Sequence, residues 1–491
     1  METNEIRKNP KKNSMMEFLK GSSALVISNV LLKAMNFFLL PLYTKYLTPD
    51  QLGISDSVTN LMSFLLPLLT LGLESAFSAF YFEKEEPDRG KRVFSTLALF
   101  FVMLGGVALL LSLFSGGISN ILFHTDKHRW LIAMAFFSTA VNLWFLPYSL
   151  ELRMKNRMMF FGIANVTASF SMILLNILFV AVFNMGEQAL VLSSLIANII
   201  QMALLILFVK KTPKAEDTDK QLLKKMLKYS LPLVPMSVLN WVLALSDRYV
   251  LLHYHGEGVV GIYGISLRFV TVLNVVISAV SMAYTTFAFQ VKNDDEDAKK
   301  KYYYVFQVES FLLMAICFTV TLFGPEVISL MSSNEAYNEA AVSLRDLLFA
   351  QTIFAMSGIV GYGINFAKKS GYYLVAVSCG AVVNLGLNLF LIPEFGMKAA
   401  AATTLIGYLI VFILVYIFSE RLYPCKYGVI RVGIVMAVLY ATCIFLDDSP
   451  IWVRIIVWVV EAASAIVAFR DILTKLYHFL RNGISRKKAK S

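Results

Sequence analysis

The feature that most constrains this chain is a long apolar stretch that recurs along its whole length. Each stretch holds 18 or more residues, and a helix that rises 1.5 Å per residue then spans a hydrocarbon core about 30 Å thick. The sequence therefore predicts an all-α, polytopic membrane protein with about 14 transmembrane helices. The expected spans are residues 19–46, 54–81, 93–115, 130–151, 157–183, 188–210, 229–253, 258–288, 303–324, 344–367, 371–393, 398–419, 428–446 and 450–472.

The composition agrees with a membrane protein. Of 491 residues, 57% are hydrophobic and 16% are charged, whereas a soluble domain carries about a quarter charged residues. The first twenty residues are polar and charged without a cleavable signal pattern, so we expect the first span to be retained. The cysteines are expected to be small core residues, because they form neither a disulfide framework nor a zinc motif; they are Cys317, Cys379, Cys425 and Cys443.

The basic residues divide unevenly between the two sides of the membrane. Most of the 44 Lys and Arg residues lie in the amino-terminal arm, in the loops that follow even-numbered spans and in the carboxy-terminal tail. Short loops rich in Lys and Arg face the cytoplasm, so both termini are predicted to be cytoplasmic. Anionic lipid accounts for the net charge of +11, and no nucleic-acid partner is expected. The outer side keeps only Lys45, Lys127, Arg129, Arg345, Lys398 and Arg454.

An internal duplication indicates two lobes. A shift of 208 residues places "LGI" at 52 over "VGI" at 260, and further along Gly186 and Gly396 match at a shift of 210. Six spans separate the copies, so both have one orientation and their pseudo-symmetry axis runs along the membrane normal. The predicted organisation is an amino-terminal six-helix lobe, a cytoplasmic basic linker, a carboxy-terminal six-helix lobe, and two extra helices with a basic tail; the ranges are 1–210, 211–228, 229–419 and 420–491.

Polar residues form a stripe in the second span. Asp56, Asn60, Ser63, Thr70 and Glu74 are spaced 4, 3, 7 and 4 apart, which places them on one face at 100° per residue. The alternative is that small polar residues only hold helices together, and for an individual Ser or Thr this alternative is favoured. Ionised groups cost several kcal/mol in lipid and usually mark a site.

Similar stripes appear in spans one, seven and eight, and we expect these four spans to line one cavity. The 208-residue shift maps Asn60 onto Arg268, which is near the midplane, as is Lys33. Arg248 is closer to the outer end of its span and could instead reach the interface. Asp247 could neutralise a neighbouring arginine, and Glu74 could pair within its lobe. The other candidates on these faces are Asn240 and Asn274.

Other constellations carry little signal. His124 and His128 stand four residues apart in an outer loop, which is weak support for a metal site. The chain has no phosphate-binding GxxxxGK[ST] motif and no room for a soluble nucleotide domain. We therefore expect no metal, no cofactor and no ATP hydrolysis on this chain, and we do not expect an enzyme.

Three segments together resemble a known family. They are "LPLYTKYLTPDQLGI" (40–54), "SDRYVLLHYHGEGVVGIYGIS" (246–266) and "VVNLGLNLFLIPEFGMKAAAATTLIGYLI" (382–410). The chain is similar, over nearly its whole length, to the polysaccharide flippases of the O-antigen and teichuronic-acid type. These belong to the multidrug/oligosaccharidyl-lipid/polysaccharide exporter superfamily, and the resemblance implies two six-helix bundles with two extra carboxy-terminal helices.

The resemblance also implies a substrate. Such flippases move an undecaprenyl-pyrophosphate-linked oligosaccharide from the inner to the outer leaflet of the bacterial cytoplasmic membrane, by alternating access of the two lobes. The cargo needs a partly cationic cavity, for which Lys33, Asn240, Arg248, Arg268 and Asn274 are the candidate binding residues. The other expected partners are membrane lipids, a polysaccharide polymerase and glycosyltransferases. Candidates for coupling transport to a charge are Asp56, Glu74 and Asp247.

Three alternatives remain open. A flippase for a lipid-linked peptidoglycan precursor has closely related chemistry. A multidrug or cation antiporter of the same superfamily would use acidic residues in a lobe, for which Asp56 and Glu74 are available. A polysaccharide polymerase or ligase would need a sizeable outer loop with basic residues, and here the longest, about 325–343, has none.

Overall fold

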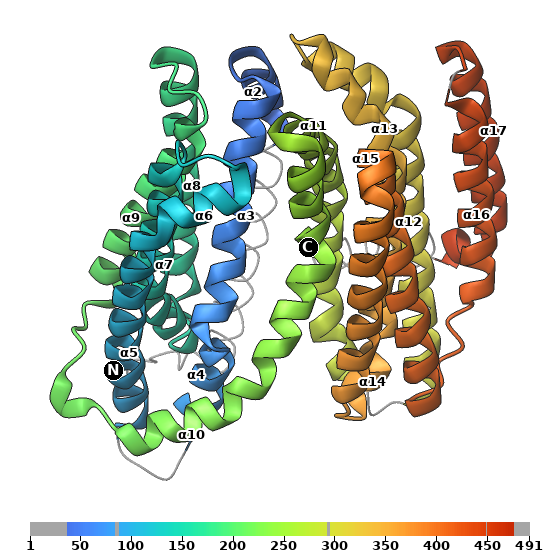
Figure 1. The fold of residues 1–491 in the computed structure, drawn as a ribbon. Coiled ribbons are helices and arrows are strands. Elements are labelled where there is room, and N and C mark those ends of the chain that lie inside the picture. The colour runs from blue at the N-terminus through green and yellow to red at the C-terminus, as the bar shows by residue number, and fades with distance from the viewer. Residues whose placement is uncertain (1–36, 84–87, 292–294, 448, 476–491) are drawn as a thin grey trace, which may run out of the picture. The chain divides into compact units, whose positions relative to one another are not determined.

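A computed structural model describes residues 37–83, 88–291, 295–447 and 449–475, and all regular elements in these ranges are helices (Figure 1). Eleven of the described segments are long and apolar enough to cross a membrane. The predicted all-α, polytopic fold class is confirmed. The chain divides into two compact units, one that ends at Gly261 and one that begins at Ile262.

The first unit contains nine described helices and the first arm of a tenth. Two short 3₁₀ or π segments extend the ends of α5 and α8. The bounds are α2 Leu40–Tyr46, α3 Pro49–Thr70, α4 Leu73–Tyr81, α5 Arg89–Leu111, α6 Ser115–Phe123, α7 Arg129–Met154, α8 Met158–Ile177, α9 Gln188–Val209, α10 Lys220–Ser230 and α11 Val234–Val291.

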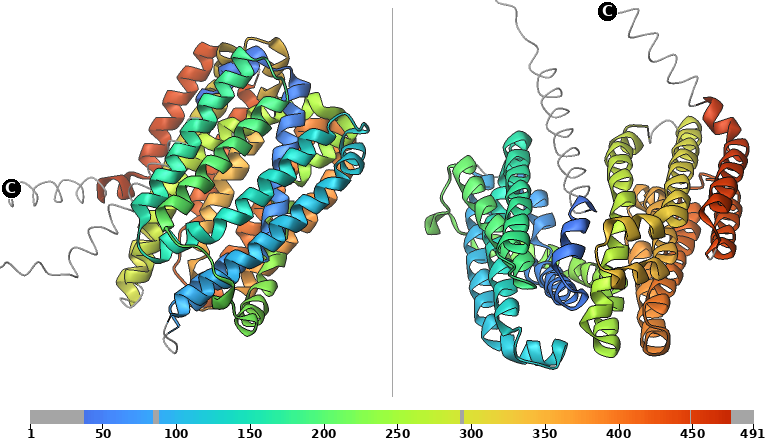
Figure 2. Two further views of the ribbon diagram at one scale, coloured as in Figure 1. Left: turned by 90° about the vertical axis from the view of Figure 1, so that its left-hand side faces the viewer. Right: turned by 90° about the horizontal axis from the view of Figure 1, so that it is seen from above.

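The second unit begins inside α11 and contains six further helices. They are α12 Asp295–Met331, α13 Ala341–Val360, α14 Tyr362–Phe366, α15 Gly371–Leu422, α16 Val429–Leu446 and α17 Ile451–Ala468. Within this unit α16 and α17 both pack on α12 and lie at one side of it (Figure 2). None of the residues of α17, all of them described, is buried. This helix therefore offers its apolar side chains to lipid.

The two longest helices each contain a break that makes them pairs of spans. α11 has 58 residues and a left-handed glycine, Gly256, with φ of 81°. α15 has 52 residues and a similar break at Gly396, with φ of 57°. A straight helix of 52 residues would be about 78 Å long, more than twice the hydrocarbon thickness. If each is counted as two spans, the described residues hold thirteen candidates, eleven plus two.

The arms of α15 fold back on each other at Gly396. Thr403 donates a hydrogen bond to the side-chain oxygen of Asn388 in the other arm. Gly380 lies so close to the carbonyl oxygen of Gly407 that a methyl group on Gly380 would be 2.9 Å away from it. In the first unit Gly186, between α8 and α9, also has a positive φ, 61°. Two glycines that match in the sequence repeat thus share a positive φ, while the predicted lobe boundaries stay a prediction.

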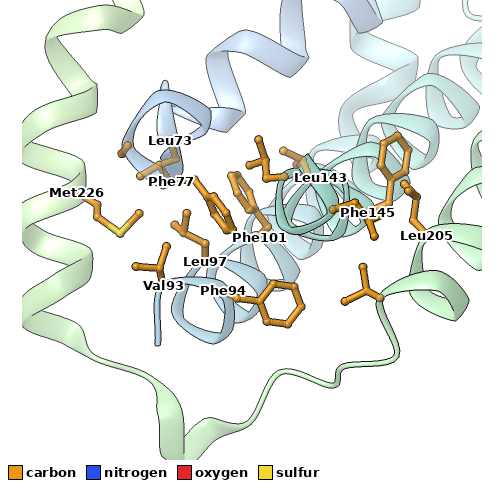
Figure 3. Packing of buried hydrophobic residues seen from close by; sticks show 14 of the residues in the cluster. Leu73, Phe77, Val93, Phe94, Leu97, Phe101, Leu143, Phe145, Leu205 and Met226 are labelled. Atoms are coloured by element: carbon orange, nitrogen blue, oxygen red, sulfur yellow. The ribbon is translucent and has the colours of Figure 1, made fainter. Parts of the chain in front are cut away.

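The core of the first unit joins six helices, α4, α5, α7, α8, α9 and α10. Leu73, Phe77, Phe101, Leu143 and Met226 are completely buried or nearly so, and Figure 3 shows them in one cluster contributed by α4, α5, α7 and α10, with Leu205 from α9 nearby. Figure 1 shows α10 crossing at one end of α4 and α5. The amphipathic helix α10 therefore covers the end of this core.

The start of α10 is fixed by a capping carboxylate. Asp219 accepts hydrogen bonds from the backbone N–H groups of Leu222 at 3.0 Å and Gln221 at 2.8 Å. These bonds favour the charged form and hold the pKa of Asp219 below its ordinary value. A similar cap begins α3, where Thr48 and Gln51 exchange side-chain to backbone hydrogen bonds.

Loops that the sequence predicts on the same side of the membrane lie together in the first unit. At the end predicted to face outward, Ser55 donates to the carbonyl of Glu187 at 2.7 Å, and the rings of His124 and His253 are 5.6 Å apart. At the other end Lys91 pairs with Asp217 at 2.9 Å and Lys211 pairs with Glu151 at 3.2 Å. Which end faces the cytoplasm stays a prediction from the charge distribution.

That prediction can be tested by thiol labelling. Asp126 and Ala215 are both exposed and belong to opposite ends of the first unit. In a variant whose four native cysteines are replaced by serine, Asp126→Cys should react with an impermeant maleimide in intact cells. Ala215→Cys should react only after permeabilisation, because its loop is among the basic ones. The reverse pattern of labelling would show that the orientation is wrong.

Candidate functional site

The candidate site is built around Arg248 and Asn60. Arg248, on the first arm of α11, donates from Nη1 to Asn60 Oδ1 on α3 at 2.7 Å. Asn60 is 7% exposed. Arg248 stands eight residues before the break at Gly256, and Asn60 stands eleven residues after the first residue of α3. At 1.5 Å per residue both lie roughly 12–17 Å from these helix ends, which is near the middle of a 30 Å core.

This position decides how Arg248 avoids lipid. The sequence left open that the guanidinium reaches the membrane interface. In the structure it instead turns to α3 and pairs with Asn60. An arginine in the hydrocarbon region normally faces a protein partner or a wet cavity and marks a functional pathway.

Neighbouring contacts hold α3 and the first arm of α11 together on both sides of the pair. Tyr249 donates from its hydroxyl to the carbonyl oxygen of Ser57 at 3.1 Å. Trp241 packs on Phe64 with ring centroids 4.5 Å apart, and on Tyr249 at 5.5 Å. The pair is therefore supported by an aromatic contact on one side and a backbone contact on the other, so its geometry does not rest on one hydrogen bond.

The pair has two hydrogen-bond donors left over. Asn60 Nδ2 and Arg248 Nε are both buried, and neither has a hydrogen-bond acceptor among the described residues. A buried donor without an acceptor costs about 1–3 kcal/mol. Since Asn60 Oδ1 is already engaged by Arg248, what the pair still offers is positive charge and N–H groups. A bound anion with several oxygens would satisfy both donors at once.

Asp247 and Asn240, two further predicted residues, lie on the same arm of α11. Asp247 is 3% exposed and accepts a hydrogen bond from the backbone N–H of Arg248 at 2.9 Å. Asn240 is half-buried and donates to the carbonyl of Met236, one turn earlier in its own helix, at 2.9 Å. Asp247 thus adjoins the candidate site, while the amide N–H of Asn240 is used within the helix.

The remaining predicted binding residues lie elsewhere. Arg268 and Asn274 belong to the second unit and are half-buried. Asn274 accepts a hydrogen bond from Gln351 on α13 at 2.8 Å. Lys33 lies outside the described residues. Asp56 is half-buried on α3, one turn before Asn60.

The prediction of one continuous stripe through Glu74 is wrong. α3 ends at Thr70, and Leu71 and Gly72 adopt left-handed conformations with φ of 51° and 68°. α4 then begins a new helix in which Glu74 is an exposed residue of the first turn. The break resets the helical phase, so the spacing of four from Thr70 no longer places Glu74 on the face of Asn60. The predicted span 54–81 is two helices for the same reason.

The hydroxyl groups of the stripes are hydrogen-bonded within their own helices. Thr59, next to the stripe, and Ser63 each donate to the carbonyl four residues earlier, at 2.8 and 3.2 Å. Thr70 donates to Pro67 at 3.1 Å, and in α11 Ser278 donates to Asn274 at 2.6 Å. These bonds stay inside one helix and need no water. The hydroxyls are therefore no argument for a wet wall, and the site rests on the Arg248–Asn60 pair.

Two buried carboxylates were missed from the sequence. Glu151 on α7 is fully buried and accepts from Lys155 at 2.9 Å and from Lys211 at 3.2 Å, so it ties α7 to the linker before α10. Glu309 on α12 is 2% exposed, and its Oε2 has no hydrogen-bond partner among the described residues. Only the rarity of an acidic residue inside an apolar stretch could have indicated Glu309. Within the described part of the chain no cluster of three His, Cys, Asp or Glu side chains is suited to hold a metal.

These features define a polytopic helical membrane protein with a cationic pair inside its first unit. A family model described as "Polysaccharide biosynthesis protein" matches residues 42–341, which is more than half of the chain. The chain belongs to this family. Among curated proteins, no sequence matches closely enough to count as a relative.

Solved structures share the fold. A lipid II flippase, MurJ, in an inward closed conformation superposes with a TM-score of 0.73 at 14% identity, covering 91% of this chain and 99% of its own. An inward-facing multidrug resistance transporter of the MATE family, from the MOP superfamily, gives 0.67 at 14% identity, with 82% and 99% covered. An outward-facing transporter of that family gives 0.60 at 16%, with 86% and 97% covered. The resemblance inferred from the sequence is confirmed for family and fold.

The unmet donors predict that the purified protein binds a polyanion. Inorganic pyrophosphate should raise the thermal unfolding midpoint in detergent, because a ligand at ten times its Kd stabilises the folded state by about 1.4 kcal/mol. The shift should disappear in Arg248→Met and in Asn60→Leu. Scanning fluorimetry at matched ionic strength measures it, with Arg157→Met, at the other end of the unit, as the control that keeps the shift. An equal shift in all variants would show that the anion binds elsewhere.

Proposed function

We propose that this protein is a flippase for an undecaprenyl-pyrophosphate-linked oligosaccharide, which it moves from the inner to the outer leaflet of the bacterial cytoplasmic membrane. The observation that carries the proposal is the pair formed by Arg248 and Asn60, whose two spare donors are buried near the middle of the membrane. The family, polysaccharide biosynthesis, supports a glycan as part of the cargo. No catalytic step is included in the proposal.

The chemistry of the cargo explains the need for such a pair. A polyprenyl tail is soluble in lipid and needs no passage through protein. The pyrophosphate and the sugars are not, because moving an isolated charge into hydrocarbon costs many kcal/mol. A guanidinium stays charged at every physiological pH and bonds two phosphate oxygens in a fork. Arg248 would therefore lower the barrier at the step where the pyrophosphate is farthest from water.

In alternating access the cargo moves between two openings, so we expect it to contact more polar and cationic groups than Arg248 alone. We propose Arg268 and Asn274, in the second unit, as further contacts, together with Lys33. Asp56 and Asp247 are then the candidates for coupling to a cation, because both are acidic residues near the Arg248–Asn60 pair in sequence and on its two helices. In this proposal both termini are cytoplasmic, and the protein acts between glycosyltransferases and a polysaccharide polymerase.

A flippase for a lipid-linked peptidoglycan precursor is the second candidate. It is favoured by the likeness to the lipid II flippase structure, which has a TM-score of 0.73, although 14% identity supports the fold alone. Restored growth of a strain depleted of its own lipid II flippase would favour this candidate. A multidrug antiporter is disfavoured, because the guanidinium of Arg248 inside the protein would repel the cationic drugs that an acidic site would bind.

The central prediction concerns export. Arg248→Ala should reduce surface glycan at least tenfold, because it removes the charge that meets the pyrophosphate, and Arg248→Lys should keep part of the activity. Asn60→Asp should also fail, since a carboxylate would form an ion pair with Arg248 and occupy the guanidinium that the cargo needs. Surface glycan is measured in a deletion strain that carries each variant at matched membrane expression.

Arg157→Ala serves as the control, because this arginine lies just before α8, away from the Arg248–Asn60 pair, and donates to the carbonyl of Phe208. It should display normal glycan. If Arg248→Ala displays as much glycan as the wild type, the role given to Arg248 is refuted. A double variant, Arg248→Ala with Arg268→Ala, then decides whether the second unit alone supplies the charge.

A further inference from the structure

Two glycines of the first unit meet with no room for a side chain. A methyl group on Gly53, in the first turns of α3, would lie 1.8 Å from the carbonyl oxygen of Glu257. A methyl group on Gly261, in α11 after its break, would lie 2.0 Å from the carbonyl oxygen of Pro49. Real Cβ atoms essentially never approach within 3.0 Å of such atoms. Glycine is required at both positions by close packing of backbones, and neither has a positive φ.

The contact is symmetric in a way that the sequence repeat explains. Glu257 is 208 residues after Pro49, and Gly261 is 208 residues after Gly53, so each contact is the counterpart of the other under the 208-residue shift. Mutual contacts of this kind, i with j and j with i, are what a two-fold axis generates. The four residues therefore lie around a local pseudo-two-fold axis.

The crossing lies near the amino-terminal end of α3, on one side of the candidate site. Asn60 follows Gly53 by seven residues, about 10 Å along the helix. Ser55, two residues after Gly53, donates a hydrogen bond to the carbonyl oxygen of Glu187, so this end of α3 is also fixed to the turn between α8 and α9. A backbone crossing buries little apolar area and rests on small residues, as in close helix pairs of membrane proteins. Such a contact separates without leaving large side chains unpacked.

We propose that the crossing of Gly53 with Gly261 is a closing contact that forms and breaks in each transport cycle, on the side predicted to face outward. The proposal rests on the proposed function for the idea of a cycle. Its direct readout, the accessibility of a residue beside the site, does not depend on which cargo is carried.

Alanine substitution tests the contact. Gly53→Ala and Gly261→Ala should each prevent close approach, because the added methyl group meets a backbone carbonyl that cannot rotate away. Thr59 is exposed on α3 and adjoins Asn60, so Thr59→Cys in a background without native cysteines serves as the reporter. An impermeant thiol reagent applied outside should label this cysteine several-fold faster in either alanine variant, and glycan export should fall. Gly106→Ala is the matched control, since a methyl group there meets nothing within 4 Å.

A reversible cross-link covers the case in which the alanine variants do not fold. A methyl group on Gly258 would lie 2.7 Å from Asp50 Oδ1, so Asp50→Cys with Gly258→Cys brings two sulfur atoms within reach of each other. The disulfide should stop export and slow outside labelling of Thr59→Cys, and reductant should restore both. Asp50→Cys alone should do neither.

The outcomes separate this inference from the proposed function. If Thr59→Cys is labelled faster in Gly53→Ala or Gly261→Ala and at the unchanged rate in Gly106→Ala, the closing contact is supported even if the cargo is a different lipid. Wild-type labelling and export in both alanine variants would overturn it. Full export by the cross-linked protein would overturn it as well, whatever the alanine variants show.

Discussion

The structure depends on one constraint, the absence of water as a hydrogen-bond partner inside the membrane. Every polar group in the spans must find a partner in the protein. Ser and Thr side chains meet this demand locally, as Thr59 does with the carbonyl of Ser55 at 2.8 Å. Between helices, Asn176 Nδ2 donates a hydrogen bond to the hydroxyl of Tyr43 at 3.0 Å. Buried donors without an acceptor among the described residues also occur elsewhere, as at Trp241 Nε1 and Arg454 Nε. What distinguishes Arg248 and Asn60 is that two such donors belong to one hydrogen-bonded pair, and that one of them is on a guanidinium.

Much of the fold could be predicted from the sequence, because apolar length and charge in the loops are set by the membrane itself. The predicted spans agree with the helices to within a few residues where no glycine intervenes, as in α7, Arg129–Met154, expected at 130–151. The prediction failed at Leu71 and Gly72, where α3 gives way to α4 inside an unbroken apolar stretch. Hydrophobicity does not indicate such a break, because the residues on both sides of it are mostly apolar and Leu71 has no intrinsic preference for a positive φ.

The candidate site could be predicted in part. The cost of a charge in lipid indicated Arg248 correctly as a residue that needs an explanation, and the stripe argument included Asn60. That the two are partners depends on how α3 lies against α11, and 188 residues separate them in the chain. Helical periodicity fixes which face a residue is on and says nothing about which other face it meets. For the same reason Glu309 was missed, since its burial depends on the helices that surround α12.

The duplication shows which features tolerate divergence between the two halves. Gly53 and Gly261 match, and so do Gly186 and Gly396, because a backbone contact or a left-handed turn leaves no other residue as a good substitute. The position of Asn60 carries Arg268 in the second half, and Arg248 corresponds to Leu40 in the first. Backbone geometry therefore repeats where charge does not. In the proposed function, a symmetric frame opens alternately to the two sides of the membrane. The proposed cargo, a pyrophosphate with a lipid tail at one end and sugars at the other, is asymmetric, so its recognition has no reason to be shared equally between the halves.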